Sequence, residues 1–420
     1  MHANWTINPR AYLSSKAGMI KKIHFPGLNG VRFIAALLVI IDHTELFKSY
    51  LGLPTLWANS YSAYLGAFGV SIFFVLSGFL ITYLLLVEKK EGPIQIKHFY
   101  LRRILRIWPL YYLLVLLGFL VVPHLSFLQV PLYSSEMSDS LDRFLLFFGL
   151  AANVAFVYFP TVAFANILWS VSVEEQFYLF WPHVVKIKQK LLGVMLFLLF
   201  LYLILKFYAG DFDPKFEELV IRTRFSSMII GGIGPYLLFH QKAFIQLLYH
   251  RLVQVALLFL FIVMGMDWID FKSFTWMQDE LISLVVCGLI VNIATNPKSL
   301  VNLENRLFSY LGKLSYGLYV HHLFAVVLVL KGLPTLLPIQ EWSPWISYPV
   351  TLGLILLLTT GISHLSYRYF ESYFLRKKVR FSKVLSGDMV GEKEKKNEAR
   401  KDAKTPRPPA GRQARSKRLD

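Results

Sequence analysis

The chain has 420 residues, of which 55% are hydrophobic and 17% are charged, and its mean hydropathy is +0.50. A soluble domain carries about 25% charged residues, so this composition excludes an ordinary water-soluble fold. Apolar runs of roughly 16 to 24 residues recur along the chain, and about 20 apolar residues in a helix cross the hydrocarbon layer of a membrane. The sequence therefore predicts an integral membrane protein.

The formal net charge is +18, and much of it lies at the C-terminal end. Residues 376–420 hold 16 basic and 6 acidic residues, and they pass through a proline- and arginine-rich stretch that is typical of disorder. Most other basic residues lie in short loops beside apolar runs, as cytoplasmic loops of membrane proteins do. We therefore expect contact with anionic membrane lipid rather than with nucleic acid. The expected parts are an N-terminal cytoplasmic segment (1–27), a membrane domain (28–375) and a basic cytoplasmic tail (376–420).

The cysteine count and the N-terminus exclude some further features. Cys287 is the single cysteine, so the chain forms no intrachain disulfide and no metal site built from several cysteines, and we expect no metal. Residues 1–29 lack the sustained apolar region of a cleavable signal peptide.

In chain order, the apolar runs predict about ten transmembrane helices. Each is expected to be helical, because backbone polar groups in lipid must be satisfied within the segment. The fold class is thus an all-α, polytopic membrane bundle. The predicted spans are 30–49, 64–87, 104–122, 168–185, 191–208, 225–240, 252–267, 278–295, 314–331 and 346–367.

Residues 142–160 are also apolar enough to span, but counting them would place Lys186, Lys188 and Lys190 outside the cell. Leaving them out restores basic loops on the inner side, with both termini cytoplasmic. We therefore predict that 142–160 is re-entrant, interfacial or packed within the protein.

The first span carries ionisable residues, which are costly in a membrane and therefore indicate function. Arg32 lies near its inner end, and Asp42 and His43 lie further along. Arg32 and His43 are eleven positions apart, which corresponds to about 16 Å of helix and to nearly the same face.

The third span opens with a cluster of arginines. Arg103 and Arg106 are three residues apart and therefore share a helix face. Guanidinium groups match phosphate oxygens, which favours a phosphate site, but arginines at a span end also serve as topology anchors that reach toward lipid headgroups.

The run 168–182, LWSVSVEEQFYLFWP, places Glu174 and Glu175 inside an aromatic helix. Glu174 reaches a membrane depth similar to that of His43. A carboxylate bonded to a histidine raises its basicity, as in enzymes that deprotonate a hydroxyl. A paired structural charge and a proton relay explain the same residues.

The later spans add polar residues in LSYGLYVHHLF. Ser315, Tyr316, Tyr319 and His322 could line a cavity, although a histidine inside a helix is more often a satisfied core residue. On the residues alone, a proton-coupled membrane transporter and an enzyme explain the charged residues equally well.

Six segments together resemble acyltransferase family 3, the multispan O-acyltransferases of bacterial envelope glycans. They stand in the family's order: LNGVRFIAALLVIIDH (28–43), GVSIFFVLSGFLITYLL (69–85), FYLRRILRIWPLYY (99–112), LWSVSVEEQFYLFWP (168–182), LGKLSYGLYVHHLF (311–324) and SYRYFES (366–372).

The resemblance implies a transfer of an acyl group, acetyl first among the candidates, from acetyl-CoA or another acyl-CoA to a hydroxyl of a glycan or glycolipid at the cell inner membrane. It implies a catalytic His43 with Glu174, and CoA binding by Arg32, Arg103 and Arg106. The family's Ser-Tyr-Tyr-His block matches Ser315, Tyr316, Tyr319 and His322, in the fifth of these segments. We expect Glu174 to orient His43, which acts as base or carries the acyl group.

The chain departs from the family's pattern at Asn29, His321 and Tyr373, where Asp, Trp and Pro are usual. Asn29 keeps a helix-capping side chain but loses a charge. Many relatives carry a fused extracytoplasmic hydrolase-like domain, which we do not expect here. A periplasmic partner that completes the transfer would then be a separate protein.

Overall fold

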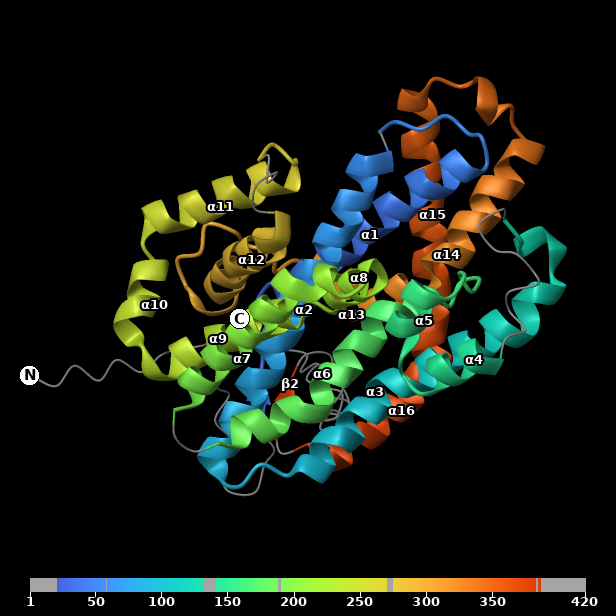
Figure 1. Cartoon of the computed structure of the whole chain (residues 1–420). Coiled ribbons are helices and arrows are strands. Elements are labelled where there is room, and N and C mark those ends of the chain that lie inside the picture. Colours follow the sequence, from blue (N-terminus) through green and yellow to red (C-terminus); the bar gives the residue numbers. More distant parts are fainter. Residues whose placement is uncertain are drawn as a thin grey trace, which may run out of the picture.

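The structure is a computed structural model that describes residues 21–57, 59–130, 141–187, 190–269, 275–382 and 384–386. Within these ranges the fold is helical except for two three-residue strands, which confirms the all-α prediction (Figure 1). The helices are α1 (Leu28–Tyr50), α2 (Asn59–Glu91), α3 (Ile96–Leu116), α4 (Leu141–Phe148), α5 (Ala152–Tyr158), α6 (Leu168–Lys186), α7 (Leu191–Tyr208), α8 (Pro214–Thr223), α9 (Phe225–His240), α10 (Lys242–Leu248), α11 (Arg251–Gly265), α12 (Gln278–Thr295), α13 (Arg306–Lys313), α14 (Ser315–Gly332), α15 (Pro344–Ser366) and α16 (Ser372–Lys378).

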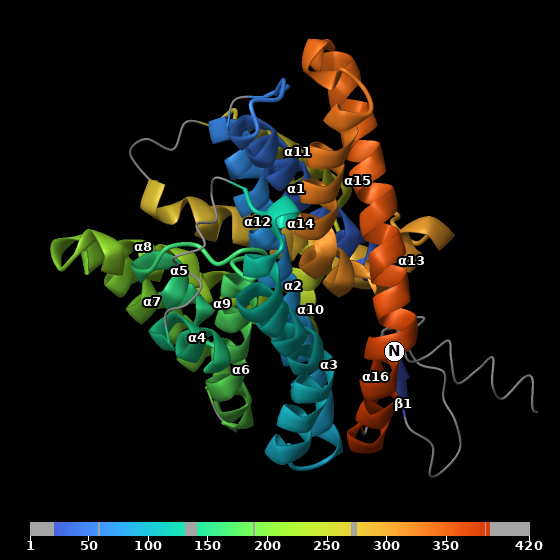
Figure 2. The ribbon, with the colours of Figure 1, turned by 90° about the vertical axis from the view of Figure 1, so that its right-hand side faces the viewer.

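Two helices are prolonged by π-helical turns. Leu117–Val121 extends α3, and Tyr367–Glu371 joins α15 to α16. The continuous rod Pro344–Phe381 has 38 residues, which corresponds to about 57 Å at 1.5 Å per residue. That length exceeds the ~30 Å hydrocarbon layer of a membrane. Figure 2 shows α15 and α16 as one long column.

The number of membrane spans is smaller on structural criteria than the ten predicted from the sequence. Each predicted range falls on a helix, but among the described residues six helical segments are long and apolar enough to cross, or seven if the pair α10 and α11, bent by 64°, is one span. The six are Tyr61–Glu91, Ile96–His124, Leu191–Asp211, Gln278–Thr295, Ser315–Thr335 and Pro344–Phe381. The protein is therefore a membrane protein, and the count of ten is not confirmed. The charges of α1 and α6 and the 16 residues of α9 explain why these three are not among the six.

The segment 142–160 forms two short helices rather than a span. At 1.5 Å per residue, α4 and α5 reach only about 12 and 10 Å. Their ends are held from within the protein: the hydroxyl of Tyr111 donates to the carbonyl oxygen of Phe147 at 2.8 Å, and Gln176 donates to that of Leu150 at 3.0 Å. Residues 142–160 are therefore not one membrane-crossing helix, as predicted, and Leu145 and Phe148 of α4 are exposed.

At the centre, α2 packs between α1 and α9. The close approach of α2 and α9 requires glycine, because a Cβ atom on Gly78 would lie 2.0 Å from the Met228 carbonyl oxygen, and one on Gly231 would lie 2.1 Å from that of Val75. α14 packs against α1 and α15, and α12 packs against α9, α11 and α2.

The two ends of the membrane domain are paired by β-structure. β1 (Lys21–Ile23) and β2 (Val384–Ser386) form a parallel two-stranded sheet, with Lys21 opposite Val384. α16 runs across the boundary predicted between residues 375 and 376, and a 3-10 turn (Val379–Phe381) follows, so residues 376–381 are helical rather than disordered. The packing of α16 against α3 extends the ordered part of the chain. The rest of the predicted tail, 387–420, and residues 1–20 lie outside the described residues.

Candidate functional site

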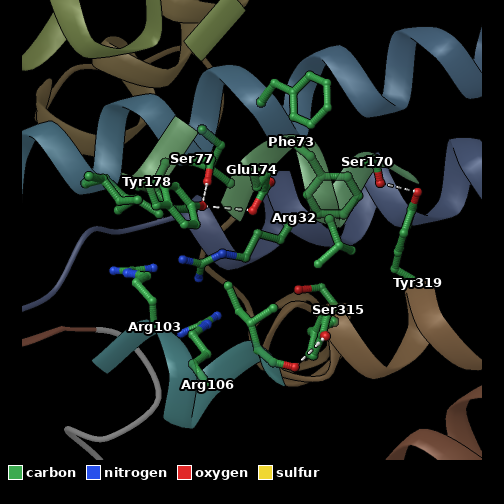
Figure 3. A pocket seen from close by; sticks show the side chains of 18 of the residues that line it. Arg32, Phe73, Ser77, Arg103, Arg106, Ser170, Glu174, Tyr178, Ser315 and Tyr319 are labelled. Carbon is green, nitrogen blue, oxygen red and sulfur yellow. Dashed lines mark hydrogen bonds between the residues drawn. The ribbon is translucent and has the colours of Figure 1, made fainter. Parts of the chain in front are cut away.

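A pocket of about 1280 Å³, with the open space at its mouth included, lies between α1, α2, α3, α6 and α14. Its wall contains the three arginines, the acid and three of the four polar residues that the sequence analysis singled out: Arg32, Arg103, Arg106, Glu174, Ser315, Tyr316 and Tyr319. Figure 3 shows the three guanidinium groups turned toward the same space as Glu174 and Tyr178. We call this cavity the arginine pocket.

Arg103 and Arg106 differ from the adjacent Arg102 in whether they form an ion pair. Arg102 turns away and forms a buried ion pair with Glu88 at 2.6 Å, so it serves the packing of α2 and α3. Arg103 and Arg106 make no ion pair with any carboxylate among the described residues. Arg103 lies over the rings of Phe99 and Tyr178, and its buried Nε has no hydrogen-bond partner there. Two guanidinium groups in one pocket, neither held in an ion pair by a described carboxylate, are suited to an anion.

Arg32 is oriented by a neighbour on its own helix. Its Nη1 donates to Asn29 Oδ1 at 2.6 Å. The capping role predicted for Asn29 is wrong, because the N-cap position of α1 is Gly27, in the left-handed region that glycine adopts without strain. Asn29 instead holds Arg32 in the pocket wall.

Glu174 is engaged inside the pocket, but not with histidine. The hydroxyl of Tyr178, one helical turn later, donates to its Oε2 at 2.8 Å, and Tyr178 also hydrogen-bonds Ser77 of α2. The neighbouring acid, Glu175, faces elsewhere and accepts from Trp108 Nε1 at 2.8 Å. The acid at 174 thus holds Tyr178, over which Arg103 lies.

The predicted hydrogen bond between Glu174 and His43 is wrong. His43 instead bonds His322 of α14, with 2.8 Å between its Nδ1 and the His322 Nε2, and the rings stack with centroids 4.9 Å apart. Neither imidazole is in the wall of the arginine pocket. The reason lies in the packing: α14 lies directly against α1, and this places His322 beside His43.

The polar residues at the other end of the pocket connect it to this histidine pair. Tyr319 bonds Ser170 of α6 with 2.6 Å between the hydroxyls, and its ring meets Phe73 edge-on with centroids 5.8 Å apart. The Tyr319 carbonyl oxygen lies 2.7 Å from His322 Nδ1. Tyr319 therefore lines the arginine pocket and also contacts His322 of the histidine pair.

Several wall residues were not singled out from the sequence. Tyr178 could have been found, because it stands four residues after Glu174 and so lies on the same helix face. Ser77, His24 and Lys378 carry no such signal. Lys378 comes from α16 and His24 follows β1, so only the fold brings them to the pocket.

All the pocket residues except His24 and Lys378 fall within the segment that matches a known family. The family model described as an acyltransferase domain matches residues 25–364. The chain belongs to acyltransferase family 3. No solved structure matches it.

Curated relatives carry related names. A Bacillus subtilis protein named "Putative peptidoglycan O-acetyltransferase YrhL" is 27% identical over 83% of this chain and 54% of its own length. A Staphylococcus aureus protein named "Putative O-acetyltransferase" is 25% identical over 86% of this chain and 59% of its own. The Listeria monocytogenes "Peptidoglycan O-acetyltransferase OatA" is 31% identical over 38% of this chain and 24% of its own. The chain thus spans little more than half the length of the first two relatives.

Proposed function

We propose that this chain is a membrane O-acyltransferase that moves an acyl group, acetyl by preference, from cytosolic acyl-CoA to a hydroxyl of a glycan or glycolipid. The observation that carries the proposal is the pair Arg103 and Arg106, two cations without a carboxylate partner among the described residues, in one pocket. The phosphates of CoA supply the anions that such a pair attracts. The family membership argues against the alternative of a proton-coupled transporter, which has no need of acyl-CoA.

In this proposal the CoA phosphates bind Arg103, Arg106 and Arg32, and the pantetheine arm extends along α1. Arg32 and His43 are eleven residues apart, about 16 Å along the helix, which is of the order that such an arm spans. The thioester carbon then comes to rest near Tyr319, beside the histidine pair.

The reaction forms a bond between the acceptor oxygen and the acyl carbon and breaks the bond between that carbon and the CoA sulfur. As a base, His43 takes the proton of the acceptor hydroxyl, and this proton then passes to the departing CoA sulfur. In the second route, His43 first accepts the acyl group and then gives it to the acceptor. Proton transfer by a positioned group contributes about 10²–10⁴-fold to rate.

Glu174 is proposed as a positioning residue. It accepts from the Tyr178 hydroxyl, and the Tyr178 ring supports the Arg103 guanidinium, with 5.4 Å from that group to the ring centroid. Its contribution to transfer then runs through the placement of Arg103 rather than through His43.

We further propose that the protein lies in the inner membrane, with both termini and the mouth of the arginine pocket at the cytoplasm. The support is the basic loop before α3 and the presence of Lys378 and His24 in the pocket wall. The acceptor is proposed to be an envelope glycan, because two relatives are named for peptidoglycan. A separate periplasmic protein is proposed as a further partner in the transfer.

The test uses the purified chain in detergent. Thermal unfolding is followed with CoA, with dephospho-CoA and without either, and transfer is followed with radiolabelled acetyl-CoA and a β-1,4-linked N-acetylglucosamine oligosaccharide as probe acceptor. The proposal predicts stabilisation by CoA that is weaker with dephospho-CoA, and label in the oligosaccharide. Equal melting temperatures with and without CoA would contradict the donor assignment.

A further inference from the structure

A backbone carbonyl group determines which ring nitrogens of His43 and His322 donate hydrogen bonds and which accept them. His322 is fully buried on α14, and its Nδ1 lies 2.7 Å from the carbonyl oxygen of Tyr319. A carbonyl oxygen can only accept, so the His322 Nδ1 carries a hydrogen. A neutral His322 then has its lone pair on Nε2.

The protonation of His43 follows from that of His322. The His43 Nδ1 lies 2.8 Å from the His322 Nε2. Because that Nε2 is an acceptor, the His43 Nδ1 must donate, and the lone pair of His43 stands on its own Nε2.

If the His322 Nε2 instead donated to the His43 Nδ1, His322 would carry a hydrogen on both nitrogens and would be a cation. A cation at this position would be completely buried, and among the described residues no carboxylate hydrogen-bonds either ring. Burying an unpaired charge is costly. The neutral arrangement is therefore the one that the surroundings of the pair favour.

We propose that His322 is a positioning residue that holds His43 with Nδ1 protonated, so that the His43 Nε2 is the reacting nitrogen. This inference rests on the proposed acyl transfer and gives His322 the part that sequence reasoning gave to Glu174. When Nε2 takes the acceptor proton, or bonds to the acyl carbon, His43 becomes a cation whose Nδ1–H still donates to His322. That hydrogen bond strengthens as the charge develops, so it stabilises the transition state more than the ground state.

Tyr319 anchors the arrangement to the arginine pocket. Its hydroxyl bonds Ser170 and the carbonyl oxygen of Ile167 at 2.6 and 3.1 Å, which fixes this part of α14 against α6. The carbonyl group that orients His322 therefore belongs to a residue already immobilised in the pocket wall.

The experiment compares His322→Leu with His322→Gln in the purified chain, using labelled acetyl-CoA and the oligosaccharide acceptor. Leucine cannot accept from His43, whereas the side-chain oxygen of glutamine can. We expect kcat to fall about 100-fold or more in His322→Leu, with the KM for acetyl-CoA within about twofold, and glutamine to restore at least a tenth of the wild-type kcat. His321→Leu is the matched control, because among the described residues that buried neighbour forms no hydrogen bond with His43 or His322, and it is expected to keep the wild-type kcat.

The outcomes separate the two proposals. A wild-type chain that transfers acetyl together with a fully active His322→Leu overturns the role of His322 alone. A glutamine variant as inactive as the leucine variant, with both retaining the wild-type melting temperature, also overturns it. A wild-type chain that binds no CoA and transfers nothing refutes the proposed function, and the role of His322 fails with it.

Discussion

Replacing Arg103 by alanine is the sharpest perturbation of the proposed donor site. The side chain lies in the wall of the arginine pocket and has no carboxylate partner among the described residues, so its loss leaves no acid unpaired. What the fold loses is the contact with the rings of Phe99 and Tyr178, whose centroids lie 5.7 and 5.4 Å from the guanidinium carbon. Such a contact contributes about 0.5–1 kcal/mol, so we expect Arg103→Ala to fold.

The loss in CoA affinity should be larger. A hydrogen bond to a charged group contributes about 1.5–3 kcal/mol, and about 1.4 kcal/mol corresponds to a tenfold change in Kd. Arg103→Ala is therefore expected to weaken CoA binding by about 10- to 100-fold. Because the contact is between opposite charges, the wild-type affinity should also fall as salt is raised.

The assay is a titration of CoA against the purified protein at fixed ionic strength. Arg251→Ala serves as the matched control, because Arg251 is an exposed arginine at the start of α11 and lies outside the arginine pocket. The control should bind CoA as the wild type does. A folded Arg103→Ala protein with the wild-type Kd would refute the assignment of this pocket to the donor.

Three further predictions concern the surroundings of the site. Arg102→Ala should lower the free energy of unfolding by about 3–5 kcal/mol, because it leaves Glu88 buried and unpaired, and adding Glu88→Gln should recover part of the loss in a thermal unfolding assay. No recovery in the double variant would contradict this. Gly78→Ala should destabilise by about 1–3 kcal/mol, whereas Gly353→Ala, whose Cβ would meet nothing within 4 Å, should not; equal melting temperatures would show that α2 and α9 do not need the close approach. Tyr178→Phe frees Glu174 to pair with Arg103, and the Kd for CoA should rise about threefold to tenfold; an unchanged Kd in the CoA titration argues against that link.

Residues on one helix were placed well from the sequence. Arg103 and Arg106 share a face because three residues make nearly one turn, and the structure brings them to one pocket with Arg32 and Glu174. The ten predicted spans also fall on helices, since long apolar runs have a single stable conformation in lipid.

Partners across helices could not be predicted in the same way. Depth along the membrane suggested that Glu174 meets His43, but depth leaves the direction of each side chain undetermined. The packing of α14 on α1 places His322 beside His43, 279 residues away in the sequence. Lys378 was assigned to a disordered tail by its charge, whereas the continuous α15–α16 rod carries it to the pocket.

The most direct test measures two properties of one variant, His43→Ala: the affinity for CoA and the rate of transfer from labelled acetyl-CoA. The arginine pocket is intact in this variant, because His43 is not in its wall. We predict that CoA binds with the wild-type Kd and that no label reaches the acceptor. Transfer at the wild-type rate would contradict the central claim that a donor held by the arginines delivers its acyl group at His43.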